Sequence, residues 1–322
     1  MRYNQLTLEK RYHISALRKQ GYKQVEIAHE LGVHPSTICR ELRRNKFHGK
    51  YQPLTAQAEY TLRQKKKTKY TVLNKPIEKY IRLKLKEDWS PEQISGRMKL
   101  DINQTIHHET IYQFIYRNKA HGGRLYKYLR HKNKKYHCRN KVYQQRGTLI
   151  DRIMIDKRPK IVDKKKRIGD LEIDTVIGKD HKGALVTVVD KRSKFALIRK
   201  VGTKQASEVS EALIEMLTPI KPILHTITSD NGKEFAYHKE VSSALNINFY
   251  FANPYHSWER GLNEHTNGLI RQYIPKKSEF ENISKEEIVT IQNRLNHRPR
   301  KSLNYKTPFE VFMKEFAKQM AA

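Results

Sequence analysis

From Ile161 onward, short apolar runs alternate with turns and amphipathic stretches, and this order constrains the fold of the 322-residue chain more than any other feature. Short runs bounded by turn residues predict strands, and longer stretches with apolar residues at helical spacing predict helices. The predicted strands are 170–178, 184–190, 195–201, 225–229 and 247–251, and the predicted helices are 206–217, 234–245 and one that begins near Trp258. The first three strands follow one another closely, which indicates an antiparallel meander.

The resulting order, β-β-β-α-β-α-β-α, is that of the ribonuclease-H-like fold. The fold class we predict for the whole chain is therefore multidomain: N-terminal helical units followed by an α/β catalytic domain. The predicted domains are a helix-turn-helix domain at 1–50, a second helical domain at 51–116, a basic linker at 117–160 and the α/β core at 161–322.

Three acidic residues stand in different settings within this core. Asp174 lies inside an apolar strand, Asp230 closes another strand, and Glu264 lies on the helix that begins near Trp258. Carboxylates from separate segments can hold two divalent cations about 3.5–4 Å apart, the arrangement that activates one oxygen and stabilises another in phosphodiester chemistry. Mg²⁺ needs only a few protein oxygens when substrate phosphates complete its shell. The sequence thus predicts a two-metal site that cuts polynucleotides.

Each of these acids also has an alternative reading. Asp170 and Glu172 share the strand face of Asp174. Either could therefore be a surface acid mistaken for the metal ligand, or could hydrogen-bond to groups around the metal without binding it. An unpaired charge among apolar neighbours is costly, which favours Asp174 as the ligand. Asp230 begins an Asp-Asn-Gly turn signal, and Glu264 could be an ordinary solvated helix residue, although Asn267 lies on the same helix face.

The charge of the chain points to a polyanionic partner. Its 65 Lys and Arg residues against 33 Asp and Glu residues give a net charge of +32, which favours nucleic acid. No long apolar run indicates a membrane, and the two cysteines, Cys39 and Cys138, are too few for a disulfide framework, so we expect a cytoplasmic protein that associates with the nucleoid when bound to DNA. The histidines near Cys138 (His107, His108, His131 and His137) match no usual zinc spacing and are better explained as surface residues.

The N-terminal segment has a helix-turn-helix pattern. Helices are predicted at 8–20, 23–31 and 35–44, with Gly32-Val33-His34 as the turn and Pro35 at the first position of the third helix. The third helix buries Ile38 and Leu42 and leaves a polar face for DNA. The residues we expect to contact bases and phosphates are Ser36, Thr37, Arg40, Arg43 and Arg44. The alternative is a three-helix packing unit with a solvated polar face.

A second helical triplet is predicted at 77–86, from Ser90 onward, and at 108–117. Thr110, Gln113 and Arg117 on its last helix could face a DNA groove, but helical triplets are common and periodicity alone does not decide their use. Residues 117–146 then hold 11 basic residues and no acid. Such a segment is a solvated linker that could also order along phosphates.

Several blocks resemble a known family. The blocks 169–178, 228–235 and 258–268, which hold the three acids, together with 269–276 and 295–301 are similar in sequence and spacing to insertion-sequence-thirty (IS30) family transposases. With the helix-turn-helix pattern, the resemblance covers nearly the whole chain. Two positions depart from the family pattern: Leu171 stands where the family often has Trp, and Ile173 where it often has Gly. Neither departure removes a carboxylate.

The resemblance implies a DDE-type, integrase-like catalytic core with Asp174, Asp230 and Glu264 as catalytic and metal-binding triad. It implies a transposase that binds the terminal inverted repeats of an insertion sequence and catalyses metal-dependent DNA strand cleavage and strand transfer. The expected cofactor is Mg²⁺, two ions per site, with Mn²⁺ as a possible substitute. The expected partners are double-stranded DNA, both element ends and target, and further copies of the chain in a dimer or higher oligomer.

Four basic residues after the third acid are further candidates for contact with the DNA backbone. They are Lys276, Lys277, Arg298 and Arg300. The structural alternative is that the two arginines brace the C-terminal helix. Two other functions stay open on the sequence alone: a non-catalytic regulator that binds an operator, and a metal nuclease that acts on RNA–DNA hybrids. A regulator does not need three acids on separate elements, and a hybrid nuclease has no evident use for sequence-reading helices.

Overall fold

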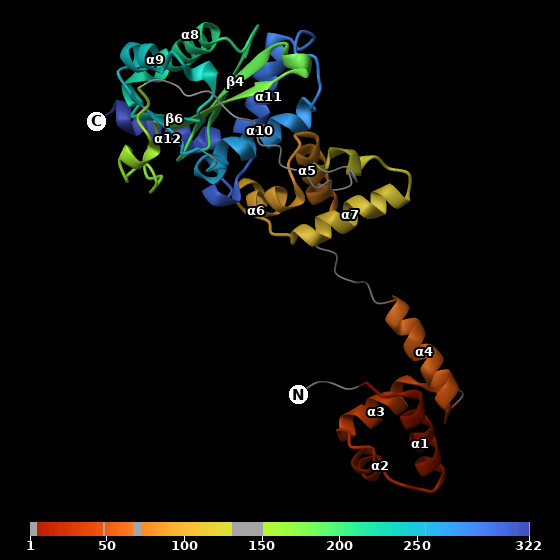
Figure 1. The fold of residues 1–322 in the computed structure, drawn as a ribbon. Helices are drawn as coiled ribbons and strands as arrows, with labels where there is room; N and C mark the ends of the chain where they lie inside the picture. Colours follow the sequence, from red (N-terminus) through yellow and green to blue (C-terminus); the bar gives the residue numbers. More distant parts are fainter. Residues whose placement is uncertain (1–4, 48, 67–72, 131–150, 255, 322) are drawn as a thin grey trace. The chain divides into compact units, whose positions relative to one another are not determined.

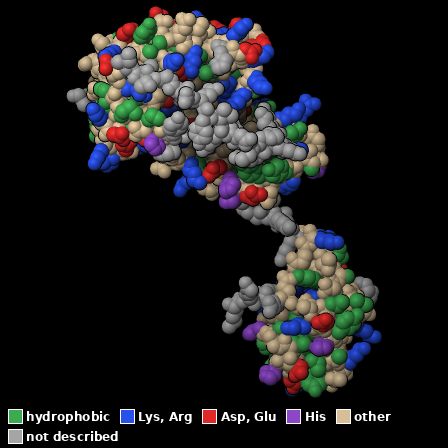
Figure 2. All heavy atoms as spheres, viewed as in Figure 1, with side chains coloured by type: hydrophobic (Ala, Val, Ile, Leu, Met, Phe, Trp, Pro, Cys, Tyr) green, Lys and Arg blue, Asp and Glu red, His purple; other side chains and the backbone are tan. Residues whose placement is uncertain are grey.

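The computed structural model describes residues 5–47, 49–66, 73–130, 151–254 and 256–321. The chain divides into two compact units, Met1–Val72 and Leu73–Ala322 (Figure 1). Lys and Arg side chains are spread over the visible face of the second unit, with Asp and Glu side chains between them (Figure 2). Among the described residues, no helix is long and apolar enough to cross a membrane.

The first unit is a helix-turn-helix with an added helix. Its elements are α1 (Leu8–Lys19), α2 (Gln24–Glu30), α3 (Pro35–Arg44), the two-residue strands β1 (Lys46–Phe47) and β2 (Lys50–Tyr51), and α4 (Pro53–Lys66). Thr7 caps α1 by accepting a hydrogen bond from the Lys10 amide, and Pro35 opens α3 as predicted. Ile14, Ile27 and Ile38 are fully buried and form the core of the three helices.

A buried arginine ties this unit together. Arg11 on α1 donates from Nε to Glu41 Oε1 on α3 at 2.8 Å, and from Nη1 to Gln57 Oε1 on α4 at 2.6 Å. The ring of Tyr60 on α4 lies under the Arg11 guanidinium, 4.9 Å from centroid to Cζ. Helix α4 therefore belongs to the first unit, whereas the sequence had assigned residues 51–66 to a second domain. The reason is tertiary: α4 buries only Ala56, so its own pattern does not reveal its partner.

The second unit begins with three helices, α5 (Lys75–Lys86), α6 (Pro91–Ile102) and α7 (His108–Ala120). These are the predicted triplet, and their core contains Ile81, Ile94 and Ile115. Polar contacts join this triplet to the C-terminal part of the chain. Arg97 on α6 donates to both carboxylate oxygens of Glu310, at 2.6 and 2.7 Å.

A five-stranded mixed sheet forms the rest of the unit. Its strands are β3 (Asp170–Ile177), β4 (Ala184–Asp190), β5 (Ala196–Val201), β6 (Thr226–Ser229) and β7 (Asn248–Phe251), in the spatial order β5-β4-β3-β6-β7. Strands β5, β4 and β3 are antiparallel, as the predicted meander requires, while β6 and β7 run parallel to β3. This order and these directions confirm the predicted ribonuclease-H-like fold.

Helices cover both faces of the sheet. Helices α8 (Ala206–Leu217) and α9 (His238–Leu245) lie on one side, and α10 (Gly261–Tyr273) and α11 (Lys285–Asn296) on the other (Figure 1). Alternate residues of β3 serve the two faces, so Ile173 packs toward α8 and α9 while Val176 packs toward α10 and α11. Glu172 and Asp174 share the face of Val176 and therefore point toward α10.

The remaining elements close the unit. Helix α12 (Pro308–Met320) follows α11 at the C-terminal end. Helix α9 is shorter than the predicted helix 234–245, because Lys233–Phe235 forms a separate short turn before it. Residues 131–150 of the predicted basic linker lie outside the described residues. Residues after them already contact the core: Met154 forms a bridge to Phe251 on β7, so the described end of the predicted linker is part of the α/β fold.

Candidate active site

The first two acids come from adjacent strands at the centre of the sheet. Asp174 is on β3, and Asp230 directly follows β6. The parallel register pairs Glu172 with Thr228, so two residues further along each strand Asp174 and Asp230 come opposite each other. The topology thus places two carboxylates, 56 positions apart in the sequence, next to each other near the centre of the sheet.

One guanidinium contacts both carboxylates. Arg260, directly before α10, places Nη1 3.8 Å from Asp174 Oδ1 and Nη2 3.3 Å from Asp230 Oδ2. The same side chain donates to the backbone carbonyl of Ile173 at 3.1 Å, which fixes it against β3. A positive charge therefore already sits where the two acids converge.

Asp174 is held in a defined orientation. Its Oδ1 accepts from the Thr175 amide at 2.9 Å, and its Oδ2 accepts from Asn267 Nδ2 on α10 at 2.9 Å. Burial raises the pKa of Asp174 to about 6; Arg260 opposes this shift, and the charge of Asp230 adds to it. A carboxylate with a raised pKa beside a second carboxylate is a site that favours a bound cation.

Glu264 lies on α10, three residues before Asn267, which places the two on one helix face. Asn267 bonds to Asp174, and Arg271 on the next turn donates to the carbonyl of Ile177 at 2.8 Å, so this face of α10 lies along β3. The Glu264 side chain is exposed. Within the described part of the chain, no three His, Cys, Asp or Glu residues are grouped closely enough to hold a metal ion. The structure thus brings Asp174 and Asp230 together and leaves Glu264 as an exposed residue of α10 outside this group.

The two alternative acids on β3 have structural partners. Asp170 accepts from Arg167 at 2.9 Å and from Thr226 Oγ1 at 2.8 Å, and it is 1% exposed. Glu172 accepts from Lys191 Nζ at 2.6 Å, and both side chains are buried. Neither carboxylate is open to a ligand, whereas Asp174 keeps 21% of its side chain exposed. The geometry favours Asp174 over its neighbours.

Two residues of this site were missed from the sequence. Arg260 precedes Glu264 by four positions, the spacing of one helix face, and this was the available signal. Glu234 is 5% exposed, accepts from Thr175 Oγ1 at 2.9 Å and pairs with Lys204 at 3.0 Å. Its charge also raises the pKa of Asp174. The sequence pattern had indicated only a helix start at Glu234.

The donor set fits hard divalent cations. Carboxylate oxygens on neighbouring elements are the ligands that Mg²⁺ prefers, and Arg260 shows that the acids attract a cation to the space between them. No cysteine or histidine takes part in this group.

Comparisons with known proteins agree with this picture. A helix-turn-helix domain family matches residues 2–45. The transposase for insertion sequence element IS4351 of Bacteroides fragilis is 46% identical over 309 residues, covering 95% of each chain. Transposase InsI for insertion sequence element IS30C of Escherichia coli is 34% identical over 319 residues, covering 95% of this chain and 82% of that one. The chain belongs to the IS30 family of transposases. Membership confirms the family and the enzyme class predicted from the sequence, a DDE transposase.

Among solved structures, the catalytic core domain of BIV integrase is similar at a TM-score of 0.38 and 15% identity, covering 47% of this chain and 98% of that one.

The transposase presents a polar face on α3. Arg40, Arg43 and Arg44 are exposed, Ser36 and Thr37 are partly exposed, and Ile38 and Leu42 are buried on the opposite side. Arg40 donates to Ser36 Oγ at 2.8 Å, so these two side chains form one polar group on the surface. The predicted DNA contacts thus share one accessible face, while their role stays a prediction.

The second predicted DNA face is also accessible. On α7, Gln113 and Arg117 are exposed and Thr110 is partly exposed. Of the residues considered for zinc, His107 and His108 lie near the start of this helix, where the His107 ring caps it by accepting from the Glu109 amide at 3.3 Å. His131, His137 and Cys138 lie outside the described residues.

The predicted contacts after the third acid divide into two groups. Lys276 and Lys277 are exposed. Arg298 is 3% exposed and donates to Gln272 Oε1 at 3.2 Å and to the Tyr273 hydroxyl. The prediction that Arg298 contacts DNA is therefore wrong for this conformation, because the side chain braces α10 from inside.

Arg300 is partly exposed and donates to the carbonyl of Leu295 at 3.1 Å. Burial lowers the pKa of Arg300 to about 10, and Arg298 adds to this effect. Both arginines therefore have structural contacts, but these go to α10 and α11 and not, as the structural alternative had predicted, to the C-terminal helix α12.

Proposed function

We propose that this transposase binds the terminal inverted repeats of its insertion sequence through the helix-turn-helix unit and catalyses Mg²⁺-dependent DNA strand cleavage and strand transfer at Asp174, Asp230 and Glu264. The observation that carries this proposal is the pair of carboxylates on β3 and after β6 that converge on the Arg260 guanidinium. Two acids that already share one cation are suited to share metal ions.

In this proposal Asp174 and Asp230 hold the metal ions, with Glu264 completing the set from α10. When bound, two Mg²⁺ ions, for which Mn²⁺ substitutes, activate the attacking oxygen and stabilise the leaving oxygen. Asn267 and the Thr175 amide orient the Asp174 carboxylate, so its oxygens point in a fixed direction before any substrate arrives. No protein nucleophile is needed: water attacks first, and the released 3′-hydroxyl attacks a second DNA phosphate in the same site.

DNA binding is assigned to separate surfaces. The polar face of α3 takes the element end, with Arg40, Arg43 and Arg44 on bases and phosphates. Thr110, Gln113 and Arg117 on α7 form a second contact with the DNA backbone. Joining two element ends requires two catalytic cores, so the active species is a dimer or a higher oligomer.

Cleavage of a duplex that carries the element end tests this proposal. The purified chain with Mg²⁺ is expected to nick this duplex at the element boundary. Asp230→Asn removes a metal-binding oxygen and its charge, so nicking should disappear while end binding persists. Asp180→Asn is the matched control, because Asp180 is exposed and its backbone φ of 51° suits asparagine.

Full nicking by Asp230→Asn would overturn the assignment of this acid. Binding without cleavage by the unaltered chain would favour the operator-binding regulator instead. Cleavage of an RNA–DNA hybrid in preference to the duplex would favour the hybrid nuclease.

A further inference from the structure

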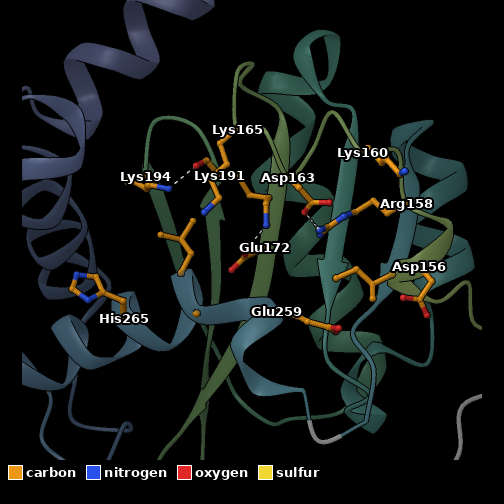
Figure 3. A pocket seen from close by; sticks show the side chains of 13 residues that line it. Asp156, Arg158, Lys160, Asp163, Lys165, Glu172, Lys191, Lys194, Glu259 and His265 are labelled. Carbon is orange, nitrogen blue, oxygen red and sulfur yellow. Dashed lines mark hydrogen bonds and ion pairs between the residues drawn. The ribbon is translucent and has the colours of Figure 1, made fainter.

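A pocket of about 670 Å³ is lined by residues from β3, from the start of α10 and from the loops around the sheet (Figure 3). Glu172 on β3 lies in it, with Arg158, Lys191 and Lys194 from the loops around the sheet and His265 from α10. Glu172 precedes Asp174 by two residues on the same strand face, a step of about 6.7 Å along a strand. The pocket is therefore the direct continuation of the candidate active site.

One end of this pocket is cationic. Lys165, Lys191 and Lys194 gather there with His265, while the other end mixes both signs, with Arg158 and Lys160 near Asp156 (Figure 3). Glu172 and Lys191 neutralise each other through their 2.6 Å ion pair, which leaves the charges of Lys165 and Lys194 in excess.

Positive charges crowd one another at this end of the pocket. Burial lowers the pKa of Lys194 to about 8, and the charge of Lys165 lowers it further. An anion at this end would favour the charged form of Lys194.

A second feature points to a ligand with oxygen acceptors. Arg158 is 7% exposed and bonds through its two terminal nitrogens to Thr228 Oγ1 at 2.8 Å and to Asp163 Oδ1 at 2.5 Å. Its Nε is buried and has no hydrogen-bond partner in the described structure. A buried donor without an acceptor costs about 1–3 kcal/mol, so the guanidinium has hydrogen-bonding capacity that the described residues do not use.

We propose that this pocket binds the backbone phosphate of a single DNA strand, one nucleotide away from the phosphate at Asp174 and Asp230. The volume admits a nucleotide but not a duplex, and among the lining residues that the structure describes only His265 carries a ring that could stack on a base. The pocket therefore takes the sugar-phosphate backbone of an unpaired strand, whatever its sequence. The placement beside the scissile phosphate rests on the function proposed above, whereas the preference for an unpaired strand does not.

Binding measured in EDTA tests this preference without cleavage. The ligands are a blunt duplex and the same duplex with a short single-stranded extension, made with each polarity. The unaltered chain is expected to bind the extended duplex of one polarity more tightly. The double variant Lys165→Gln/Lys194→Gln should lose this advantage, and its salt dependence on the extended duplex should fall by about 0.7 in the log-log slope for each lost phosphate contact.

The control is Lys164→Gln/Arg192→Gln, which removes the same charge from neighbouring exposed positions that do not line the pocket. It should keep the advantage of the extended duplex. The single variant Lys165→Gln, at an exposed position, gives a second measurement if the double variant unfolds.

Equal affinity of the unaltered chain for blunt and extended duplexes of both polarities would overturn the pocket proposal. An equal loss of the advantage in the pocket variants and the control would also overturn it. If Mg²⁺-dependent nicking fails but the lysine-dependent advantage remains, the proposed function falls and the pocket stands.

Discussion

Replacing Asp174 with asparagine should stabilise the metal-free transposase while removing a proposed metal ligand. The Asp174 carboxylate is costly when ionised, because burial and the neighbouring charge of Asp230 raise its pKa from 3.8 to about 6. A shift of about 2 units corresponds to about 3 kcal/mol at 1.36 kcal/mol per unit. The asparagine gives up one acceptor for Thr175 or Asn267, a loss of about 1 kcal/mol. Asp174→Asn should therefore raise the free energy of unfolding by about 1–2 kcal/mol.

The sign of the pH dependence follows from the direction of the shift. Folded Asp174 takes up a proton near pH 6, whereas in the unfolded chain it does so only near 3.8. Protonation of Asp174 therefore stabilises the unaltered protein as the pH falls. The pH-dependent part of the difference in free energy of unfolding between Asp174→Asn and the unaltered protein should drop to about half at pH 5 and to below about 1 kcal/mol at pH 4. Above pH 6 the advantage should be constant.

Thermal unfolding in EDTA measures this effect. For a unit the size of Leu73–Ala322, each kcal/mol corresponds to about 2–4 °C in Tm, so Asp174→Asn should unfold several degrees higher than the unaltered chain at pH 8. Glu264→Gln is the matched comparison, because the exposed Glu264 should alter cleavage without altering this Tm. An unchanged or lower Tm for Asp174→Asn at pH 8, or an advantage that persists in full at pH 4, would refute the reasoning.

Three further predictions concern other parts of the chain. Arg11→Met leaves Glu41 buried without its partner, so the first unit should lose about 3–5 kcal/mol, seen as faster hydrogen exchange in α1 and α3 with little change in the second unit. Arg43→Gln on the exposed face of α3 should lower the log-log salt slope of duplex binding by about 0.9 without lowering Tm, and an unchanged slope would remove Arg43 from the DNA contacts. Arg298→Gln should do the reverse, lowering Tm through its lost contact to Tyr273 while the salt slope stays the same.

How far the sequence predicts each element depends on where its stabilisation comes from. Strand β4 and helix α8 were predicted to the residue, because every residue of β4 is buried and α8 has a clear apolar face. Helix α4 was missed, since its polar surface is held by Gln57 and Tyr60 against Arg11, a contact that local periodicity does not encode. Helix α11 does carry a readable signal, the capping box of Ser284 and Glu287.

In the candidate site, too, some residues can be identified from local sequence and others only from tertiary contacts. A charge inside an apolar strand is unusual enough to identify Asp174, but Asp170 and Glu172 on the same face could be set aside only when Arg167 and Lys191 were seen to pair with them. Arg260 could not be placed from the sequence, because its role depends on how the chain before α10 turns toward β3.

The acids and Arg260 together predict that metal binding releases protons near pH 6. Asp174 must be ionised to bind a cation, and near pH 6 about half of the folded molecules carry a proton there. Titration with Mg²⁺ or Mn²⁺ in buffers of different ionisation enthalpy should therefore show a proton release that is small at pH 8 and rises as the pH falls, to about half a proton from Asp174 at pH 6. In Arg260→Ala the cation that opposes the raised pKa is gone, so the release should move to higher pH. Proton release that is independent of pH, or unaffected by Arg260→Ala, would mean that Asp174 is not among the groups that bind the metal.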